Sequence, residues 1–291
     1  MKRIISIILV LLGLLTGCGT SPEPAQIAAT TLPVYEFTSR LCADTDITVC
    51  RLITESVSCL HDYTLNVSQV RAAEAAELII INGAGLEEFM EDLFHDKELL
   101  DSSTGMVLME CEEETDHDHD HHGHHHEVDS HIWLSPENAM LMAENICTGL
   151  CERYPEYADI LQVNLQTLLA DLDALQAYGE AELSALSCRE LITFHDGFSY
   201  LASSFDLTIL EAVEEESGSE ASAGELKHLI EEVRHHTLPA IFTETNGSDS
   251  AASVISRETG ASIYTLDMAM SGDSWFDAMY HNIDTLKEAL E

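Results

Sequence analysis

The stretch PEYADILQVNLQTLLADLDALQAYGEAELSALS, Pro155–Ser187, decides the fold. Its leucines and alanines recur at three- and four-residue intervals, and no proline follows the first position, so the spacing predicts one long helix. Pro155 suits the first turn of such a helix. At 1.5 Å per residue, about 32 residues of helix would run roughly 48 Å, which is more than one small domain needs. We therefore expect a rigid strut that joins two lobes.

Short apolar, β-branched runs alternate with amphipathic stretches on both sides of this helix, which indicates βαβ units and parallel sheets. The strands expected before it are Asp46–Ile53, Leu78–Asn82 and Gly105–Met109, with a helix over Val67–Glu77. The strands expected after it are Glu190–Phe194, Leu207–Val213, Ala240–Glu244 and Ala261–Leu266, with helices over Gly224–His236, Asp249–Thr259 and Ser274–Glu291. The predicted fold class is α/β, with two lobes that each hold a mostly parallel sheet flanked by helices. The expected boundaries are 27–152 for the first lobe, 153–187 for the connecting helix and 188–291 for the second lobe.

The N-terminus, MKRIISIILVLLGLLTGCGT, has two basic residues, then an apolar run, then small residues before Cys18. The run is too short for a comfortable membrane span and is typical of an export signal. Small residues directly before a cysteine resemble a bacterial lipobox, so we expect a signal peptide over residues 1–18, a lipid on Cys18 and a tether over 19–26. The protein would be exported and anchored to the outer face of the cytoplasmic membrane. The alternative is an ordinary secretory signal with an incidental cysteine.

The net charge is strongly negative, with 53 acidic residues against 12 Lys and Arg and a formal charge of −41. This argues against nucleic acid as a partner and against a polybasic membrane patch. The chain has eight cysteines but no C-x-x-C pair, which argues against a thiolate zinc site or a thioredoxin-like site.

Several side chains with metal-binding capacity stand where strands are expected to end. His195, Glu244 and Asp267 each lie at the carboxyl end of an expected strand of the second half, and His61 follows one of the first half by a short loop. Ligands of open parallel sheets bind beyond these ends, so this is where a site would be assembled. Taken singly, a loop histidine is usually solvated and an aspartate before a helix is usually a cap. The shared placement favours a site.

A histidine-rich tract precedes one further histidine in DHDHDHHGHHHEVDSHIWLSP, Asp116–Pro136. The histidines of the tract are His117, His119, His121, His122, His124, His125 and His126. Because the tract has no apolar residue, it cannot bury a core, and we expect a mobile loop over 113–128 that gathers metal weakly. The alternative is a solvated linker with incidental metal affinity. His131 differs because it stands beside Ile132 and Trp133, in a phrase that will pack, and it is the expected ligand.

The order and spacing of these phrases resemble the metal-binding lipoprotein components of ABC importers for zinc and manganese. The resemblance covers nearly all of the chain after the signal. It rests on TTLPVYEFTSRL (30–41), HDYTLNVSQVRAAEAAELIIINGAGLEEF (61–89), DSHIWLSPENA (129–139), ITFHDGFSYLASSFDL (192–207), AIFTET (240–245) and TLDMA (265–269).

The resemblance implies a ligand set and a set of supporting carboxylates. The implied metal ligands are His61, His131, His195 and Asp267. Glu244 matches a carboxylate that the family keeps near the site, as an outer partner or an alternate ligand, while Asp62 and Asp196 are further candidates to orient the imidazoles. Each half would supply two ligands, so the metal would bridge the lobes.

Three imidazoles and one carboxylate suit tetrahedral Zn²⁺, whereas Mn²⁺ prefers more oxygen ligands and higher coordination. Members of the family that resemble manganese carriers typically have a carboxylate in the third position, which here is His195, so zinc is favoured. The expected function is capture of Zn²⁺ outside the cytoplasm and its delivery to the membrane subunit of an ABC permease.

Three alternatives remain beside this interpretation. One is a carrier of manganese or another divalent metal in the same importer class. Another is a surface adhesin, because lipoproteins of this kind are exposed on cells. The third, a zinc hydrolase with Glu244 as its base, would need an open coordination position. The chain has no H-E-x-x-H, nucleophile elbow or phosphate loop, so we expect no enzyme.

Overall fold

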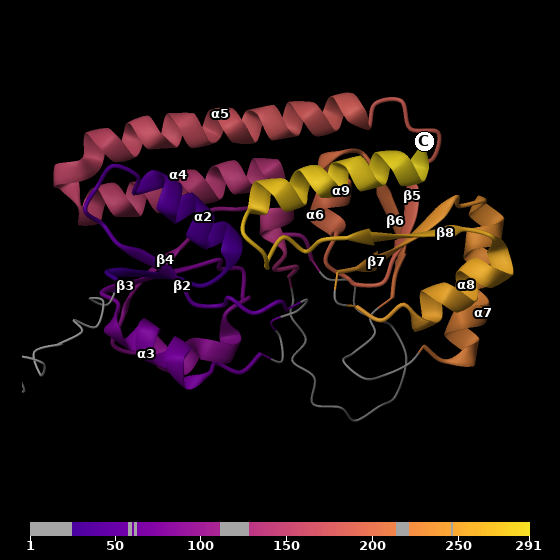
Figure 1. Ribbon diagram of the computed structural model, residues 1–291, viewed down its shortest axis with the longest axis horizontal. Helices are drawn as coiled ribbons and strands as arrows, with labels where there is room; N and C mark the ends of the chain where they lie inside the picture. The colour runs from indigo at the N-terminus through magenta and orange to yellow at the C-terminus, as the bar shows by residue number, and fades with distance from the viewer. Residues whose placement is uncertain (1–24, 58–59, 61–62, 111–127, 214–220, 246) are drawn as a thin grey trace, which may run out of the picture.

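The computed structural model describes the chain apart from residues 1–24, 58–59, 61–62, 111–127, 214–220 and 246. Two sheets, each of four parallel strands, lie on the left and right of Figure 1. The first sheet has the order β2-β1-β3-β4, with β1 (Ile27–Ala29), β2 (Val49–Arg51), β3 (Leu78–Ile81) and β4 (Glu98–Asp101). The second has the order β6-β5-β7-β8, with β5 (Glu190–Thr193), β6 (Thr208–Ala212), β7 (Ala240–Glu244) and β8 (Ser262–Leu266). The predicted α/β class with two parallel sheets is confirmed.

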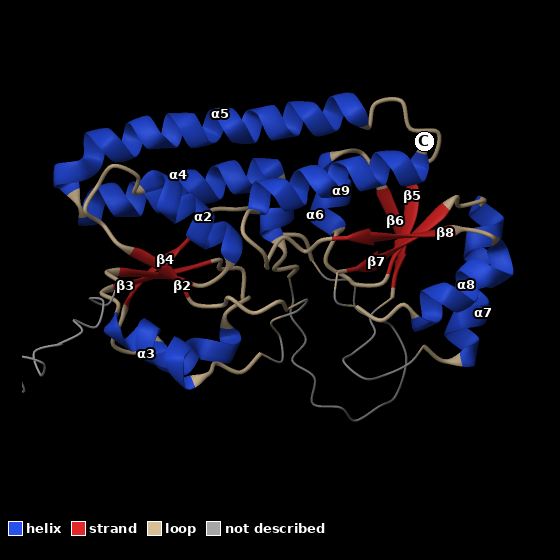
Figure 2. Cartoon of the chain, in the orientation of Figure 1, coloured by secondary structure: helices blue, strands red, loops and turns tan. Residues whose placement is uncertain are grey.

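The helices flank both sheets (Figure 2). They are α2 (Leu32–Leu41), α3 (Val67–Ala75), α4 (Pro136–Arg153), α5 (Ala158–Glu182), α6 (Ser199–Ser204), α7 (Ala223–His236), α8 (Ser250–Thr259) and α9 (Trp275–Leu290). Short 3₁₀ helices are η2 (Glu88–Leu93), η3 (Ile132–Leu134) and η4 (Pro155–Tyr157). In the part of the chain that the structure describes, no helix combines the length and the apolar character needed to cross a bilayer.

The long helix expected between the halves is α5, which has 25 residues and runs roughly 38 Å. It is shorter than the sequence predicted at both ends. Pro155 begins the 3₁₀ helix η4 instead of the α-helix, and the α-helix ends at Glu182, where a turn follows. Arg189 Nη2 donates to the carbonyl of Leu183, the C-cap residue, at 2.9 Å. The helix packs against α2 and α4 of the first half and α9 of the second, as Figure 1 shows.

The prediction of a strand over Gly105–Met109 is wrong. That segment has no regular structure, and Val107 is 92% exposed, so its apolar run does not mark a buried strand. The fourth strand is instead β4, an edge strand whose one partner among the described residues is β3. An edge strand has one neighbour and does not need the continuous apolar pattern of a central strand, which is why the sequence concealed it.

One hydrophobic core runs through both halves. It includes the fully buried rings of Phe37 and Trp133 and the side chain of Leu172, together with Phe198 and Trp275 of the second half. A second apolar cluster, with Leu229 and Ile255 among its members, fills the space between the second sheet and helices α7 and α8. Because the larger core crosses from one half to the other, separating the halves would break close-packed contacts.

Candidate metal centre

His131 of the first half and His195 of the second bring their Nε2 atoms to 3.4 Å from each other. Two ligands of a tetrahedral ion with bonds of 2.0–2.1 Å are about 3.3–3.4 Å apart, so this separation fits one shared Zn²⁺. The rings meet edge to face with centroids 5.3 Å apart. The side chains of His131 and His195 are 6% and 14% exposed, so the point between them is largely shielded from water.

His131 stands directly before η3, and Asp129 holds its ring. Asp129 Oδ1 accepts hydrogen bonds from the backbone N–H of His131 and from its Nδ1, both at 2.8 Å. A carboxylate can only accept, so the proton lies on Nδ1 and the lone pair on Nε2 faces His195. A carboxylate behind the ligating histidine fixes both the tautomer and the orientation of the ring. Sequence reasoning missed Asp129, although its spacing of two residues from His131 was a usable signal.

Asp129→Ala is expected to weaken Zn²⁺ binding by about 10–100-fold, the usual effect of losing the outer partner of a ligating histidine. The ring would lose its fixed tautomer while the Nε2 ligand stays in the chain. The dissociation constant is measured by competition with a chromophoric chelator at pH 7.5. The matched control is Asp173→Ala, an exposed aspartate on α5, which should leave the constant unchanged. Equal affinity of Asp129→Ala and the parent would contradict this role.

The other candidates of the second half share one edge of the second sheet. His195 comes two residues after β5, Glu244 ends β7 and Asp267 directly follows β8; these three strands are neighbours. Glu244 Oε2 lies 3.5 Å from Nδ1 of His195, the ring nitrogen opposite the one that faces His131. This is the position that an outer partner of a ligating histidine takes. Asp196 follows His195 in the loop before α6 and is half-buried.

Asp267 is held by the buried side chain of Asn282 on α9. The Asp267 N–H donates to Asn282 Oδ1 and Asn282 Nδ2 donates to the Asp267 carbonyl, each at 2.7 Å. Asp267 Oδ1 accepts from the Ala269 N–H at 2.7 Å. A carboxylate has about four acceptor sites, so this bond leaves capacity for a metal. Asn282 is a supporting residue that the sequence did not reveal.

The remaining residues that the sequence singled out cannot be placed. His61, Asp62, the seven histidines of the tract and Cys18 lie outside the described residues. Their roles stay predictions from the sequence.

Hydrogen bonds between the halves hold the sequence neighbours of His131. Trp133 Nε1 donates to the Met268 carbonyl at 2.7 Å, and Trp275 Nε1 donates to the Trp133 carbonyl at 3.1 Å. The hydroxyl of Tyr200 on α6 donates to the Asp129 carbonyl at 3.1 Å. The segment that carries His131 is therefore positioned by the second half as well as by its own sheet.

A buried carboxylate supports this segment from behind. Glu87 Oε1 accepts from Thr30 Oγ1 at 2.6 Å and from the Asn82 N–H at 2.7 Å, and Glu87 Oε2 accepts from the Gly83 N–H at 3.1 Å. Asn82 Nδ2 in turn donates to the Ser130 carbonyl, one residue before His131. Burial raises the pKa of Glu87 to about 7 although these hydrogen bonds oppose the rise.

Glu87→Gln is expected to flatten the dependence of stability on pH. Because the pKa is 4.5 ordinarily and about 7 in the folded protein, the native state binds more protons in this window, and stability falls as pH rises through it. This difference in pKa between the unfolded and the folded protein corresponds to about 3 kcal/mol of unfolding free energy in the parent. Urea unfolding at pH 5 and pH 7.5 measures it. The exposed neighbour Glu88, changed to Gln, should keep the parent slope; an unchanged slope in Glu87→Gln would refute the assignment.

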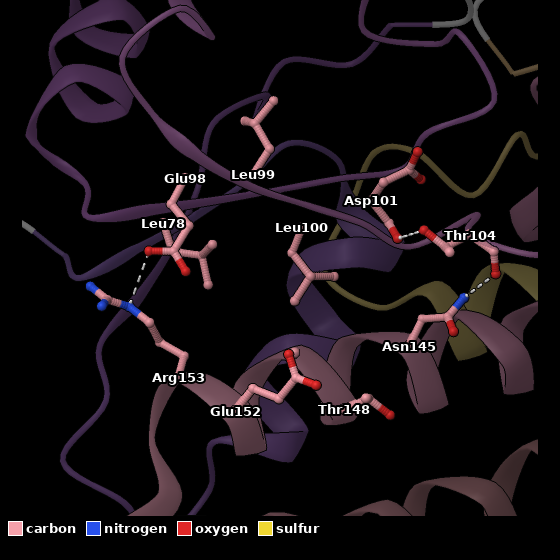
Figure 3. A pocket seen from close by; sticks show the side chains of 11 residues that line it. Leu78, Glu98, Leu99, Leu100, Asp101, Thr104, Asn145, Thr148, Glu152 and Arg153 are labelled. Carbon is pink, nitrogen blue, oxygen red and sulfur yellow. Dashed lines mark hydrogen bonds and ion pairs between the residues drawn. The ribbon is translucent and has the colours of Figure 1, made fainter.

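A groove elsewhere on the first half lies between β4 and α4 (Figure 3). Charged and polar side chains line much of it, with Arg153 Nε 3.5 Å from Glu98 Oε2 and Asn145 Nδ2 donating to the Thr104 carbonyl at 2.9 Å. Among the described candidate ligands, none lines this groove. It is separate from the point where His131 and His195 meet.

Similarity to known proteins gives the family of the chain. Residues 27–289 match the family described as zinc-uptake complex component A, periplasmic. The high-affinity zinc uptake system protein ZnuA of Bacillus subtilis (strain 168) is 28% identical over an alignment of 306 positions, gaps included, that covers 95% of this chain and 94% of that protein. The manganese-binding lipoprotein MntA of Halalkalibacterium halodurans is 26% identical over 242 residues, 79% of this chain and 77% of its own. A crystal structure of ZnuA matches with a TM-score of 0.78 at 28% identity, over 92% of this chain and 100% of that chain.

The family match covers most of the chain and agrees with the resemblance that the sequence motifs indicated. The relatives include proteins named for zinc, for manganese and for iron, so the comparisons give a metal-binding component and do not identify its metal. The family is one of binding components of uptake systems, which confirms that the protein is not an enzyme. The chain belongs to the zinc-uptake complex component A family of periplasmic metal-binding proteins.

Proposed function

We propose that this protein captures Zn²⁺ between its two halves and delivers it to the membrane subunit of an ABC permease. His131 and His195 are two of the ligands, and His61 and Asp267 complete a tetrahedral set. The single observation that carries the proposal is the 3.4 Å separation of the two Nε2 atoms, one from each half. A metal ion at this point would be the transported substrate, bound by ligands from both halves.

The chemistry of the ligands selects zinc over manganese. Both imidazoles that meet in the structure present nitrogen, a borderline donor that suits Zn²⁺, while Mn²⁺ is better served by carboxylate and water oxygen. Asp129 and Glu244 lie behind these rings and increase the basicity of the nitrogens that face the metal. Ligation requires neutral imidazoles, so acid releases the metal.

Two further parts of the proposal rest on the sequence. A lipid on Cys18 would hold the carrier at the outer face of the cytoplasmic membrane, close to the permease. The histidine-rich tract over 113–128 would collect Zn²⁺ weakly and raise its local concentration. The shared core and the hydrogen bonds between the halves oppose large lobe movements, so release would require the permease to disturb the loops that carry the ligands.

Metal content measured by mass spectrometry tests the function. Protein is produced without a tag in medium that contains limiting and equal concentrations of Zn²⁺ and Mn²⁺. It is then dialysed against a weak chelator, which removes metal bound weakly by the histidine-rich tract. The expected result is about one Zn²⁺ per chain and a trace of Mn²⁺, because sites with nitrogen ligands bind Zn²⁺ more tightly than Mn²⁺. Retention of Mn²⁺ in preference to Zn²⁺, or of neither, would overturn the proposal.

A further inference from the structure

A second group of metal-binding side chains lies on the last turn of α7. The group is Glu232, His235 and His236, called here the α7 cluster, and one ligand atom from each lies within 4.8 Å of the others. The residues stand at positions i, i+3 and i+4, which share one face of a helix. Sequence reasoning singled out none of them and predicted only the helix over Gly224–His236.

Glu190 gives the α7 cluster the arrangement of an oriented metal ligand. His236 Nδ1 lies 2.8 Å from Glu190 Oε2, and its Nε2 lies 3.5 Å from Glu232 Oε2. The first contact is that of a carboxylate which holds the proton on one ring nitrogen and leaves the lone pair of the other available. The second is close to the distance of about 3.3–3.4 Å between two ligands of one tetrahedral ion. The His235 ring lies beside it, with centroids 4.8 Å apart.

The α7 cluster is separate from the centre at His131 and His195. Glu190 is the first residue of β5, whereas His195 comes two residues after the end of β5. The α7 cluster therefore lies at the amino ends of the strands of the second sheet, and the centre lies at their carboxyl ends. At 3.3 Å per residue, the strand between them spans about 16 Å. No single ion could reach both groups.

We propose that the α7 cluster is a second, weaker binding site for Zn²⁺, with Ni²⁺ and Cu²⁺ as competing ions. Two imidazole nitrogens and one carboxylate oxygen are ligands that these metals accept. The side chains of Glu190, Glu232 and His236 are 43%, 28% and 24% exposed, so water completes the coordination and competes for the ligands. The formal charge of −41 raises the concentration of cations near this surface.

The alternative explanation of these distances is a set of ion pairs without a metal. A protonated His236 would pair with Glu190 through Nδ1 and with Glu232 through Nε2, and the same distances would result. An experiment must therefore detect the ion at the site, and it must separate this site from the centre and from the histidine-rich tract.

Crystals of the full chain soaked in ZnCl₂ test the proposal directly. Anomalous difference maps from data on both sides of the zinc absorption edge should show a peak about 2.0–2.1 Å from His236 Nε2. The peak should be absent from His236→Ala and present in His131→Ala/His195→Ala, so failure of the α7 site and failure of the central site give different results. No peak at His236 at millimolar Zn²⁺ would overturn the proposal.

Equilibrium dialysis against Zn²⁺ gives the second measurement. Glu190→Gln keeps every ligand of the α7 cluster but loses the orienting carboxylate, so the affinity of the weak site should fall about 10–100-fold. His228→Ala is the matched control, because His228 is on the same helix and its Nε2 lies 3.2 Å from a carboxylate, Glu211 of β6, but it is not part of the cluster. Equal zinc binding by the parent, His236→Ala and Glu190→Gln at all concentrations would also overturn the proposal.

Discussion

His131→Ala/His195→Ala is expected to lose at least about a thousandfold in Zn²⁺ affinity, because each change removes a ligand and an outer partner alone is worth 10–100-fold. The two Nε2 atoms lie 3.4 Å apart and belong to different halves, so the double variant removes one ligand from each half. The measurement is competition with a tight fluorescent zinc chelator at pH 7.5, where the affinity of the parent is compared with that of the double variant.

The control for this experiment is His281→Ala, an exposed histidine on α9 that should leave the tight phase intact. Circular dichroism should show that the double variant keeps its fold, because the two changes remove polar side chains and leave the residues of the hydrophobic core unchanged. Weak binding should persist in the double variant, from the tract and the α7 cluster. A tight phase of one Zn²⁺ per chain that survives in the double variant would show that His131 and His195 do not form the centre.

Trp133→Ala is expected to lower the free energy of unfolding by about 4 kcal/mol or more, near the upper end for truncation of a buried aromatic ring. Trp133 is fully buried in the core that both halves share. Its Nε1 donates to the Met268 carbonyl at 2.7 Å, so the change also leaves a carbonyl of the second half without this donor. Thermal unfolding should show a midpoint lower by roughly 10 °C.

The matched variant Trp133→Phe separates packing from hydrogen bonding. Phenylalanine keeps most of the ring but cannot donate to Met268, so we expect a loss of about 1–3 kcal/mol. The zinc affinity should also fall in Trp133→Ala, because the Trp133 ring lies 5.3 Å from the His131 ring and Met268 follows Asp267. A change of less than 1 kcal/mol in Trp133→Ala would show that the contact between the halves contributes little to stability.

The sequence predicted those elements whose pattern is local. The strands β3 and β7 are short apolar runs that the sheet buries on both faces, and both were predicted within one residue of their ends. Helices α7, α8 and α9 follow clear amphipathic spacing and begin and end close to the expected residues. Strand β1 was not predicted; it is three residues long, whereas the equally short β2 lies within the longer predicted strand Asp46–Ile53. Periodicity needs several residues before it can be read.

The residues of the candidate centre also divide into those that the sequence named and those that only the structure revealed. The resemblance named His131, His195, Glu244 and Asp267, but the carboxylate behind His131 is Asp129, which only the structure revealed. Asn282, Tyr200 and Trp133 also support the centre through hydrogen bonds that join distant parts of the chain. The choice between zinc and manganese, the ligand roles of His61, His131, His195 and Asp267, and the adhesin alternative stay predictions.

The sequence by itself determined the α/β class, the repeated alternation in two halves and the long helix between them, because strand and helix patterns depend on near neighbours. The tertiary structure decided which side chains meet. His131 and His195 are 64 residues apart, and their contact depends on the core that packs one half against the other. Packing of distant residues leaves no periodic signal in a single chain, so the distance between these two nitrogens could be known only from the folded molecule.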